Sequence, residues 1–262
     1  MLLNEENYSS SEIYAALNTG RDLLTHLNRS QLASDLSLLG QLRTDIENNF
    51  DGFKIAYQPI YFVHRVKGCT NKRIVALEAL IRWKEVSPSD FIPIAESCDL
   101  IHNISEWVLK QVIEEINLSK SINYDGKINH KYFINVSSAL VSPKHAFLDM
   151  VKSVFEASSD ALSRIGIEKD IKTETFGVGE SSLSRLRDLH VDKIKIDRSF
   201  TDIKHEKSLV ILKNLLAMAH ELGVMVVVEG IESEEQLEHF MGMGFLFFQG
   251  FLLGKPSLSF LR

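Results

Sequence analysis

The stretch Ala76-Leu77-Glu78-Ala79-Leu80-Ile81-Arg82-Trp83 decides the fold of this chain of 262 residues. Apart from Glu78 and Arg82 it is apolar, which is typical of a strand that is buried on both faces. A buried carboxylate costs several kcal/mol of folding free energy unless a partner or a metal compensates its charge. Glu78 therefore predicts a functional site on a strand inside the protein.

The same pattern, a polar side chain late in an apolar run, recurs along the chain. The other positions are Asn135, Lys195, Asp197, Glu229 and Gln249. The apolar runs alternate with amphipathic helical stretches, which indicates a parallel sheet covered on both faces. With this many units, the sequence predicts a closed α/β barrel. Such barrels carry their sites at the C-terminal ends of the strands, where we expect these polar groups to meet.

Hydrophobic periodicity places the individual elements. The predicted strands are 53–60, 74–83, 132–136, 193–196, 224–228 and 244–248. The predicted helices are 36–49, 104–116, 146–155, 183–189, 208–222 and 234–241. Gly223 follows the fifth of these helices and is expected to end it, as a glycine after the last turn commonly does.

Composition excludes several classes of protein. The formal net charge of −6 argues against a general nucleic-acid binder. No apolar run reaches the ~18 residues needed to cross a membrane, and the first residues lack the features of a signal peptide. Cys69 and Cys98 lack CxxC spacing, and the histidines show no metal-ligand spacing. We expect a cytoplasmic protein that binds neither nucleic acid nor membrane.

Residues 1–33 are expected to form a helical extension that is separate from a barrel domain at 34–262. Ser9 with Glu12 fits a capping box, and apolar residues recur after it at helical spacing. The apolar face of this helix must be buried against something. The sequence leaves open whether it packs on the outside of the barrel, plugs a gap in it, or forms a surface for a dimer or a partner.

From about Ser34 to Pro256 the chain resembles the EAL domain, the bacterial cyclic-di-GMP phosphodiesterase module. The motifs that carry the resemblance stand in family order: Tyr57-Gln58-Pro59-Ile60, Glu78-Ala79-Leu80-Ile81-Arg82-Trp83, Phe91–Glu96, Ile134–Ser137, Phe176–Gly179, Val191–Phe200, Glu229–Glu232 and Gln249–Phe251. The resemblance implies a TIM-like (β/α) barrel of EAL type. It also raises a homodimer, because many members of the family dimerise through the barrel.

The resemblance implies a set of catalytic and metal-binding residues. In that family two divalent cations, usually Mg²⁺ or Mn²⁺, hold the phosphate and the attacking water. Glu78 and Asn135 would bind the first metal. Lys195 would contact the water or the phosphate. Asp197 and Glu229 would organise the site and help to deprotonate the water.

The resemblance also implies residues on the ligand side. Arg82 suits a phosphate oxygen, because its guanidinium donates two hydrogen bonds at once. Gln58 and Gln249 would meet the guanine side, where amide groups both donate and accept. Without a metal, an ion pair of Arg82 with Glu78 or with another carboxylate would satisfy both charges, and the sequence does not separate this role of the arginine from phosphate binding.

The chain departs from the family pattern at residues 170–177, Asp-Ile-Lys-Thr-Glu-Thr-Phe-Gly. This segment must stand for both the Glu-Ile-Thr-Glu strand of the family and its Asp-Asp-Phe-Gly loop. If 171–174 match the strand, Ile171 takes the place of a metal ligand. If Glu174 and Thr175 match the aspartate pair, only Glu174 can reach a metal. In either alignment a βα unit of roughly 25 residues is missing.

Three functions therefore stay open. The loss of acidic ligands favours a catalytically impaired regulatory protein of cyclic-di-GMP signalling, which binds a protein partner or intact cyclic-di-GMP. The second is an active phosphodiesterase that hydrolyses cyclic-di-GMP to pGpG with Mg²⁺ or Mn²⁺. The third is an interaction scaffold that no longer binds nucleotide. Glu180 favours the scaffold, because it places an acid where the family often has an aromatic residue.

Overall fold

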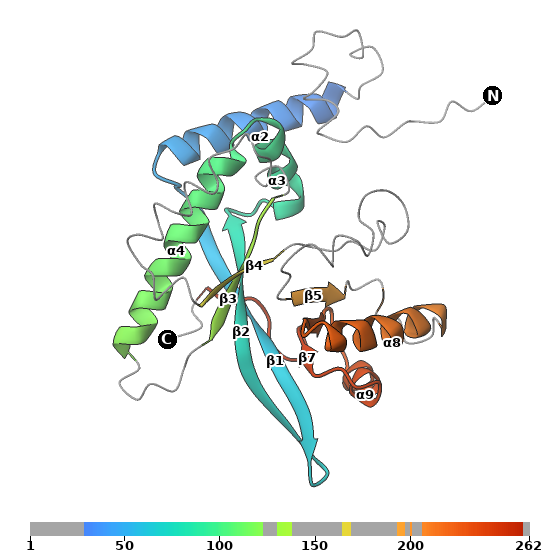
Figure 1. Cartoon of the computed structure of the whole chain (residues 1–262). Coiled ribbons are helices and arrows are strands. Elements are labelled where there is room, and N and C mark those ends of the chain that lie inside the picture. The colour runs from blue at the N-terminus through green and yellow to red at the C-terminus, as the bar shows by residue number, and fades with distance from the viewer. Residues whose placement is uncertain are drawn as a thin grey trace, which may run out of the picture. The chain divides into compact units, whose positions relative to one another are not determined.

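A computed structural model describes residues 29–122, 130–137, 164–168, 193–196, 200 and 206–258 (Figure 1). The chain divides into two compact units. The first unit comprises Met1–Ile55, Ile81–Ile113 and Ser137–Ser158. The second unit comprises Ala56–Leu80, Glu114–Val136 and Ser159–Arg262.

The first unit contains helices α2 (Arg29–Glu47) and α3 (Pro88–Ser97) and the beginning of α4 (Ile101–Ile122). The sequence patterns do not predict α3, because Pro93 lies inside it. Pro88 occupies the first turn, where the absent N–H would lack a partner in any case.

An aromatic cluster forms the centre of the first unit. Phe53 stacks on Trp83 with ring centroids 5.7 Å apart, and both rings meet Phe91 edge-on. The indole Nε1–H of Trp83 donates to Asp45 Oδ2 over 2.8 Å, so the buried ring has its polar atom satisfied. Lys84 Nζ lies 2.5 Å from the same carboxylate oxygen and balances its charge.

The described residues of the second unit form a seven-stranded sheet in the order β4-β3-β2-β1-β7-β6-β5. Its strands are β1 (Phe53–Val66), β2 (Cys69–Trp83), β3 (Lys131–Asn135), β4 (Ile165–Glu168), β5 (Lys193–Ile196), β6 (Met225–Val228) and β7 (Phe247–Phe248). The first residues of β1 and the last residues of β2 belong to the first unit. Helices α8 (Glu206–Glu221) and α9 (Glu234–Gly242) connect the last strands.

One strand runs against the expected parallel direction. β2, β3 and β4 are parallel, as are β5, β6 and β7, but β1 pairs antiparallel with β7. The expectation that all strands are parallel is therefore wrong for β1. The reason is the two-residue turn Lys67-Gly68, with φ of 52° and 80°, which joins β1 directly to β2. A parallel partner would need a crossover of about a dozen residues.

The sheet order agrees with the predicted α/β fold, a partial TIM-like barrel of EAL type. β4 and β5 end the sheet, and no backbone pairing joins them within the described residues. They flank the part of the chain where the sequence predicts a missing βα unit. That missing unit stays a prediction, because residues 169–192 lie outside the described part of the chain.

Most predicted elements are present with shifted ends. β5 has the predicted bounds, whereas β1 and β2 extend further into their hairpin, and α2 begins at Arg29. β4 is absent from the prediction because Gly166 interrupts its apolar run. The helices predicted at 146–155 and 183–189 and in the N-terminal extension lie outside the described residues. The division between 1–33 and 34–262 stays a prediction.

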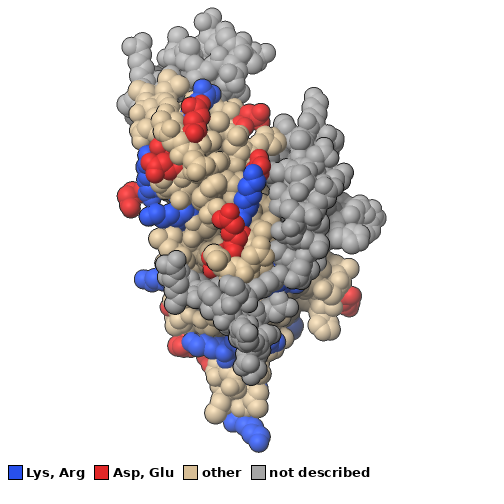
Figure 2. All heavy atoms as spheres, turned by 90° about the vertical axis from the view of Figure 1, so that its left-hand side faces the viewer, with Lys and Arg blue, Asp and Glu red and all other residues tan. Residues whose placement is uncertain are grey.

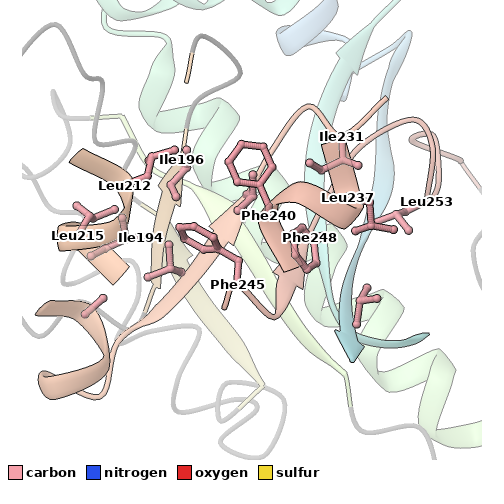
Figure 3. Close-up of a cluster of buried hydrophobic side chains, with 14 residues drawn as sticks. Ile194, Ile196, Leu212, Leu215, Ile231, Leu237, Phe240, Phe245, Phe248 and Leu253 are labelled. Atoms are coloured by element: carbon pink, nitrogen blue, oxygen red, sulfur yellow. The ribbon is translucent and has the colours of Figure 1, made fainter. Parts of the chain in front are cut away.

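A large apolar cluster packs the helices of the second unit against its strands (Figure 3). Figure 3 labels Ile194 and Ile196 of β5, Leu212 and Leu215 of α8, and Leu237 and Phe240 of α9, with Ile231, Phe245, Phe248 and Leu253 from β7 and nearby segments. Each of these side chains is buried. Burial of side chains of this size stabilises the fold by about 1.5–3 kcal/mol each, so this cluster fixes β5, β6 and β7 as one body.

Two observations concern membrane-spanning proteins and nucleic-acid binders, the classes that the composition argues against. None of the described helices combines the length and the apolar character needed to span a bilayer. On the face drawn in Figure 2, basic and acidic side chains are interspersed among neutral residues. The described residues of that face therefore form no continuous basic patch.

Gly223 offers a test of how α8 ends. Its φ is 69°, and a Cβ there would meet nothing within 4 Å, so only backbone strain opposes a side chain. Gly223→Ala is expected to lower the free energy of unfolding by about 1–2 kcal/mol in urea denaturation. Gly242→Ala is the control, because Gly242 has open space around it but no positive φ, and it should leave stability unchanged or slightly higher. Equal losses in both variants would contradict the conformational explanation.

Candidate functional site

Glu78, near the middle of the sheet, is the centre of a buried hydrogen-bond network. Its side chain comes from β2, and the residue is 3% exposed. Asn135 Nδ2 donates to Oε1 over 2.9 Å, and Lys195 Nζ donates to the same oxygen over 3.1 Å. Gln249 Nε2 donates to Oε2 over 2.8 Å. Four of the predicted site residues thus meet at one carboxylate.

The strands position these donors as the sequence pattern predicts. Asn135 is the last residue of β3, Lys195 lies late in β5, and Gln249 directly follows β7. The backbone N–H of Gln249 donates to Val228 O over 2.9 Å, and the N–H of Ile231 donates to Gln249 O over 3.1 Å. These main-chain bonds hold the amide side chain toward Glu78.

Lys195 connects Glu78 to a second carboxylate. Its Nζ lies 2.5 Å from Glu229 Oε1 as well as 3.1 Å from Glu78 Oε1. Glu229 directly follows β6, and its N–H donates to Ile196 O over 3.1 Å. The lysine side chain is only 10% exposed. One ammonium group is therefore shared by two acids in a site largely shielded from water.

The charge state of Glu78 follows from this arrangement. Burial by itself raises the pKa of the carboxyl, but the positive charge of Lys195 opposes it most strongly. The hydrogen bond from Asn135, the charge of Lys193 and the hydrogen bond from Gln249 act in the same direction as Lys195. The net result is a pKa below the ordinary value, so Glu78 is ionised at neutral pH.

A cavity of about 330 Å³ lies next to this network within the second unit. Gln58, Lys195, Glu229 and Gln249 all line it, as does Glu78. Among the described residues, Oε1 of Gln249 is buried without a hydrogen-bond partner.

Two residues that the sequence reasoning missed also line the cavity, Phe251 and Glu232. Phe251 is 56% exposed and offers an aromatic face at the cavity. Both lie inside quoted motifs, directly after Gln249-Gly250 and Glu229-Gly230-Ile231. Their closeness in sequence to Gln249 and Glu229 was the signal that could have identified them as cavity residues.

The remaining predicted residues have different outcomes. Gln58 lines the cavity, and its Nε2 donates to Gly254 O over 3.2 Å. Arg82 belongs to the first unit, where its Nη1 donates to Ile81 O over 2.7 Å. Asp197 and Glu174 lie outside the described residues, so their predicted roles stay predictions.

The position of β4 bears on how residues 170–177 depart from the family pattern. The strand beside β3 is Ile165–Glu168, earlier in the chain than the alignment at 171–174. In its register Glu168 is the partner of Asn135, which itself bonds to Glu78. The backbone register therefore pairs the last residue of β3 with an acidic position, the last residue of β4. The sequence reasoning missed Glu168 because Gly166 concealed the strand.

Gly250 is required for the wall of the cavity. A Cβ on it would lie 2.1 Å from Ile231 O and 2.3 Å from Ile231 N. Such contacts do not occur in folded proteins, so the two backbone segments approach this closely only at a glycine. The N–H of Leu252 then donates to Ile231 O over 3.1 Å and fixes the approach.

The described donors do not fit a divalent cation. Glu78, Glu229 and Asn135 carry oxygen atoms of the kind that Mg²⁺ and Mn²⁺ prefer. The ammonium group of Lys195, however, lies 3.1 Å from Glu78 Oε1 and 2.5 Å from Glu229 Oε1, so both carboxylates already have a cationic partner. Within the described part of the chain no three His, Cys, Asp or Glu residues gather as a metal site.

Comparison with known proteins gives a consistent family. The family described as EAL domain matches residues 39–171 and 161–256. The biofilm architecture maintenance protein MbaA of Vibrio cholerae is 32% identical over 293 residues, which cover 99% of this chain and 35% of that protein. The bifunctional diguanylate cyclase/cyclic di-GMP phosphodiesterase MucR of Pseudomonas aeruginosa is 29% identical, over 95% of this chain and 39% of that protein.

Among solved structures, a PaMucR phosphodiesterase in complex with c-di-GMP aligns with a TM-score of 0.70. It is 26% identical, and the alignment covers 84% of this chain and 98% of that one. The chain spans little more than a third of the length of these two curated relatives. The similarity therefore concerns one domain of longer proteins.

The low pKa of Glu78 predicts how stability depends on pH. Below the ordinary value of 4.5, the unfolded chain binds a proton at this carboxyl more readily than the folded chain does. Stability therefore falls as pH decreases through this range toward the lower pKa of the folded state. In Glu78→Gln this part of the fall should be absent in urea denaturation followed from neutral to acidic pH. The exposed Glu85→Gln is the control, and an identical pH profile in wild type and Glu78→Gln would contradict the argument.

Proposed function

Because this chain belongs to the EAL domain family, we propose that it is a catalytically impaired member of cyclic-di-GMP signalling that regulates by binding. Its ligand is intact cyclic-di-GMP or a protein partner, and the cavity favours the nucleotide. The impairment rests on one observation. Both oxygens of Glu78 are occupied by three donors, and its charge is already compensated by Lys195.

The impairment has a simple physical basis. Hydrolysis of a phosphodiester needs a nucleophile generated from water, which the family obtains from bound cations. In this chain the ammonium group of Lys195 already pairs with both Glu78 and Glu229. Thr175 also stands where the family has an aspartate in one of the two alignments.

The cavity matches a guanine base better than it matches a phosphate. Glu229 and Glu232 line it, and their carboxylates accept hydrogen bonds. Guanine presents N–H groups along its edge, which such acceptors bind. Phe251 adds an exposed aromatic face for stacking. Among the described residues that line the cavity, Lys195 is the one with a positive charge. One ammonium group can pair with only part of the negative charge of a cyclic dinucleotide.

A second candidate function, an active phosphodiesterase, is favoured by the residue types that this network brings together. Glu78, Asn135, Lys195 and Glu229 are close together, and Glu168 is the backbone register partner of Asn135. If the part of the chain outside the described residues supplies further acids, a metal site can be completed. An assay of the reaction therefore decides between the two.

The deciding experiment is incubation with cyclic-di-GMP and excess Mg²⁺ or Mn²⁺, with nucleotides separated by chromatography over hours. We expect the cyclic dinucleotide to persist unchanged. Appearance of pGpG in the wild type that disappears in Glu78→Ala would overturn the proposal and establish an active phosphodiesterase. Binding of cyclic-di-GMP measured by calorimetry under the same conditions separates a nucleotide-binding regulator from a scaffold.

Phe251 provides a specific test of nucleotide binding. If a guanine stacks on its exposed ring, Phe251→Ala should weaken cyclic-di-GMP affinity by about tenfold or more in calorimetry. Val210→Ala, on the exposed face of α8, is the matched control and should leave the affinity unchanged. Equal affinities of Phe251→Ala and wild type would remove the stacking contact from the proposal.

A further inference from the structure

Within the described residues, the sheet of the second unit ends at β4 on one side and at β5 on the other. In the described residues no backbone ladder joins these two strands. Any link across this opening within the described part of the chain is therefore made by side chains. β3 lies next to β4 on the side away from the opening. Its buried Phe133 contacts Lys193 of β5 and so makes such a link.

Phe133 extends over β4 because its neighbour there has no side chain. In the β3–β4 register, Phe133 is the partner of Gly166. A Cβ at position 166 would lie 2.5 Å from Cε1 of the Phe133 ring. Only a glycine at this position leaves room for the ring, which is 1% exposed.

The other side of the opening contributes a cation to this ring. Lys193 of β5 is 4% exposed, and its Nζ lies 3.8 Å from the centroid of the Phe133 ring. A side chain of β5 thus contacts a side chain of β3 above the glycine of β4. An ammonium group held this close over an aromatic ring is attracted by the electrons of its face, most strongly where water is excluded.

The same lysine acts on the candidate site. In the β2–β3 register the partner of Phe133 is Glu78. The positive charge of Lys193 is one of the influences that lower the pKa of Glu78. Lys193 and Lys195 lie two residues apart on one strand, so both point to the same side of the sheet.

We propose that Lys193 is a positioning residue, which closes the opening between β4 and β5 through Phe133 and thereby holds β5 with Lys195 beside Glu78. The closure is independent of the proposed function. Its consequence for nucleotide affinity rests on that function.

A double-mutant cycle tests the closure. Lys193→Met keeps the length of the side chain and removes its charge, and Phe133→Leu removes the ring. We expect Lys193→Met to raise the unfolding equilibrium constant about tenfold in wild type and much less in the Phe133→Leu background. Additive effects, or a Lys193→Met protein as stable as wild type, would overturn the proposal, since relief of a buried charge would then outweigh the contact.

Two further measurements separate positioning from general stability. Hydrogen exchange at the amides of β3 and β5 should accelerate in Lys193→Met, while exchange in the first unit stays unchanged. Lys193→Arg, which keeps the cation, should restore most of the loss, and the exposed Lys213→Met should show none. Uniform acceleration across both units, or failure of arginine to restore protection, counts against the proposal.

Nucleotide affinity supplies the last readout. In calorimetry with cyclic-di-GMP, Lys193→Met should bind more weakly than wild type under conditions where both are fully folded, and Lys193→Arg should recover. If wild type binds no nucleotide, the nucleotide-binding proposal fails while the double-mutant cycle still decides the role of Lys193. Equal affinities of folded wild type and Lys193→Met would overturn the link to the site.

Discussion

The buried charge of Glu78 is the constraint on which the second unit depends. A carboxylate this far from water needs donors for both oxygens and a counter-charge, and it receives them from β3, β5 and the residue after β7. Each donor is fixed by the strand that carries it. The side chains can therefore meet only if those strands are in register and end at the same edge of the sheet. The hydrogen bonds to Glu78 therefore form only in this strand order and register.

This dependence explains how much of the molecule was predictable. Glu78, Asn135, Lys195, Glu229 and Gln249 were found from sequence because a polar residue late in an apolar strand has few explanations. The direction of β1 was missed, since the turn at Lys67-Gly68 lies in a stretch that reads as polar and exposed. Periodicity reports which face a residue occupies and gives no information on whether the next strand arrives by a hairpin or a crossover.

Glycines account for the other failures of the sequence reading. Gly166 interrupts an apolar run and so concealed β4, and with it Glu168 as the backbone register partner of Asn135. The same glycine is what gives Phe133 its space. Glycine has a low strand propensity, but at position 166 it leaves the space that the Phe133 ring fills. That space exists only in the packed protein, so the sequence alone does not show it. Lys193 was missed for a related reason, because nothing in one sequence shows that a lysine is buried against a ring.

The pairing of β1 with β7 also governs the order in which the protein can fold. Tyr61 and Phe62 find their partners Phe248 and Phe247 only after almost the whole sheet-forming sequence has been synthesised. Until then one edge of β1 has no strand beside it, and Gln249 is not available to Glu78. Closure of so long a loop is slow, and an open edge on an apolar strand invites pairing with other chains. During synthesis on the ribosome, the central strand is thus the first part of the sheet to emerge and the last to be protected.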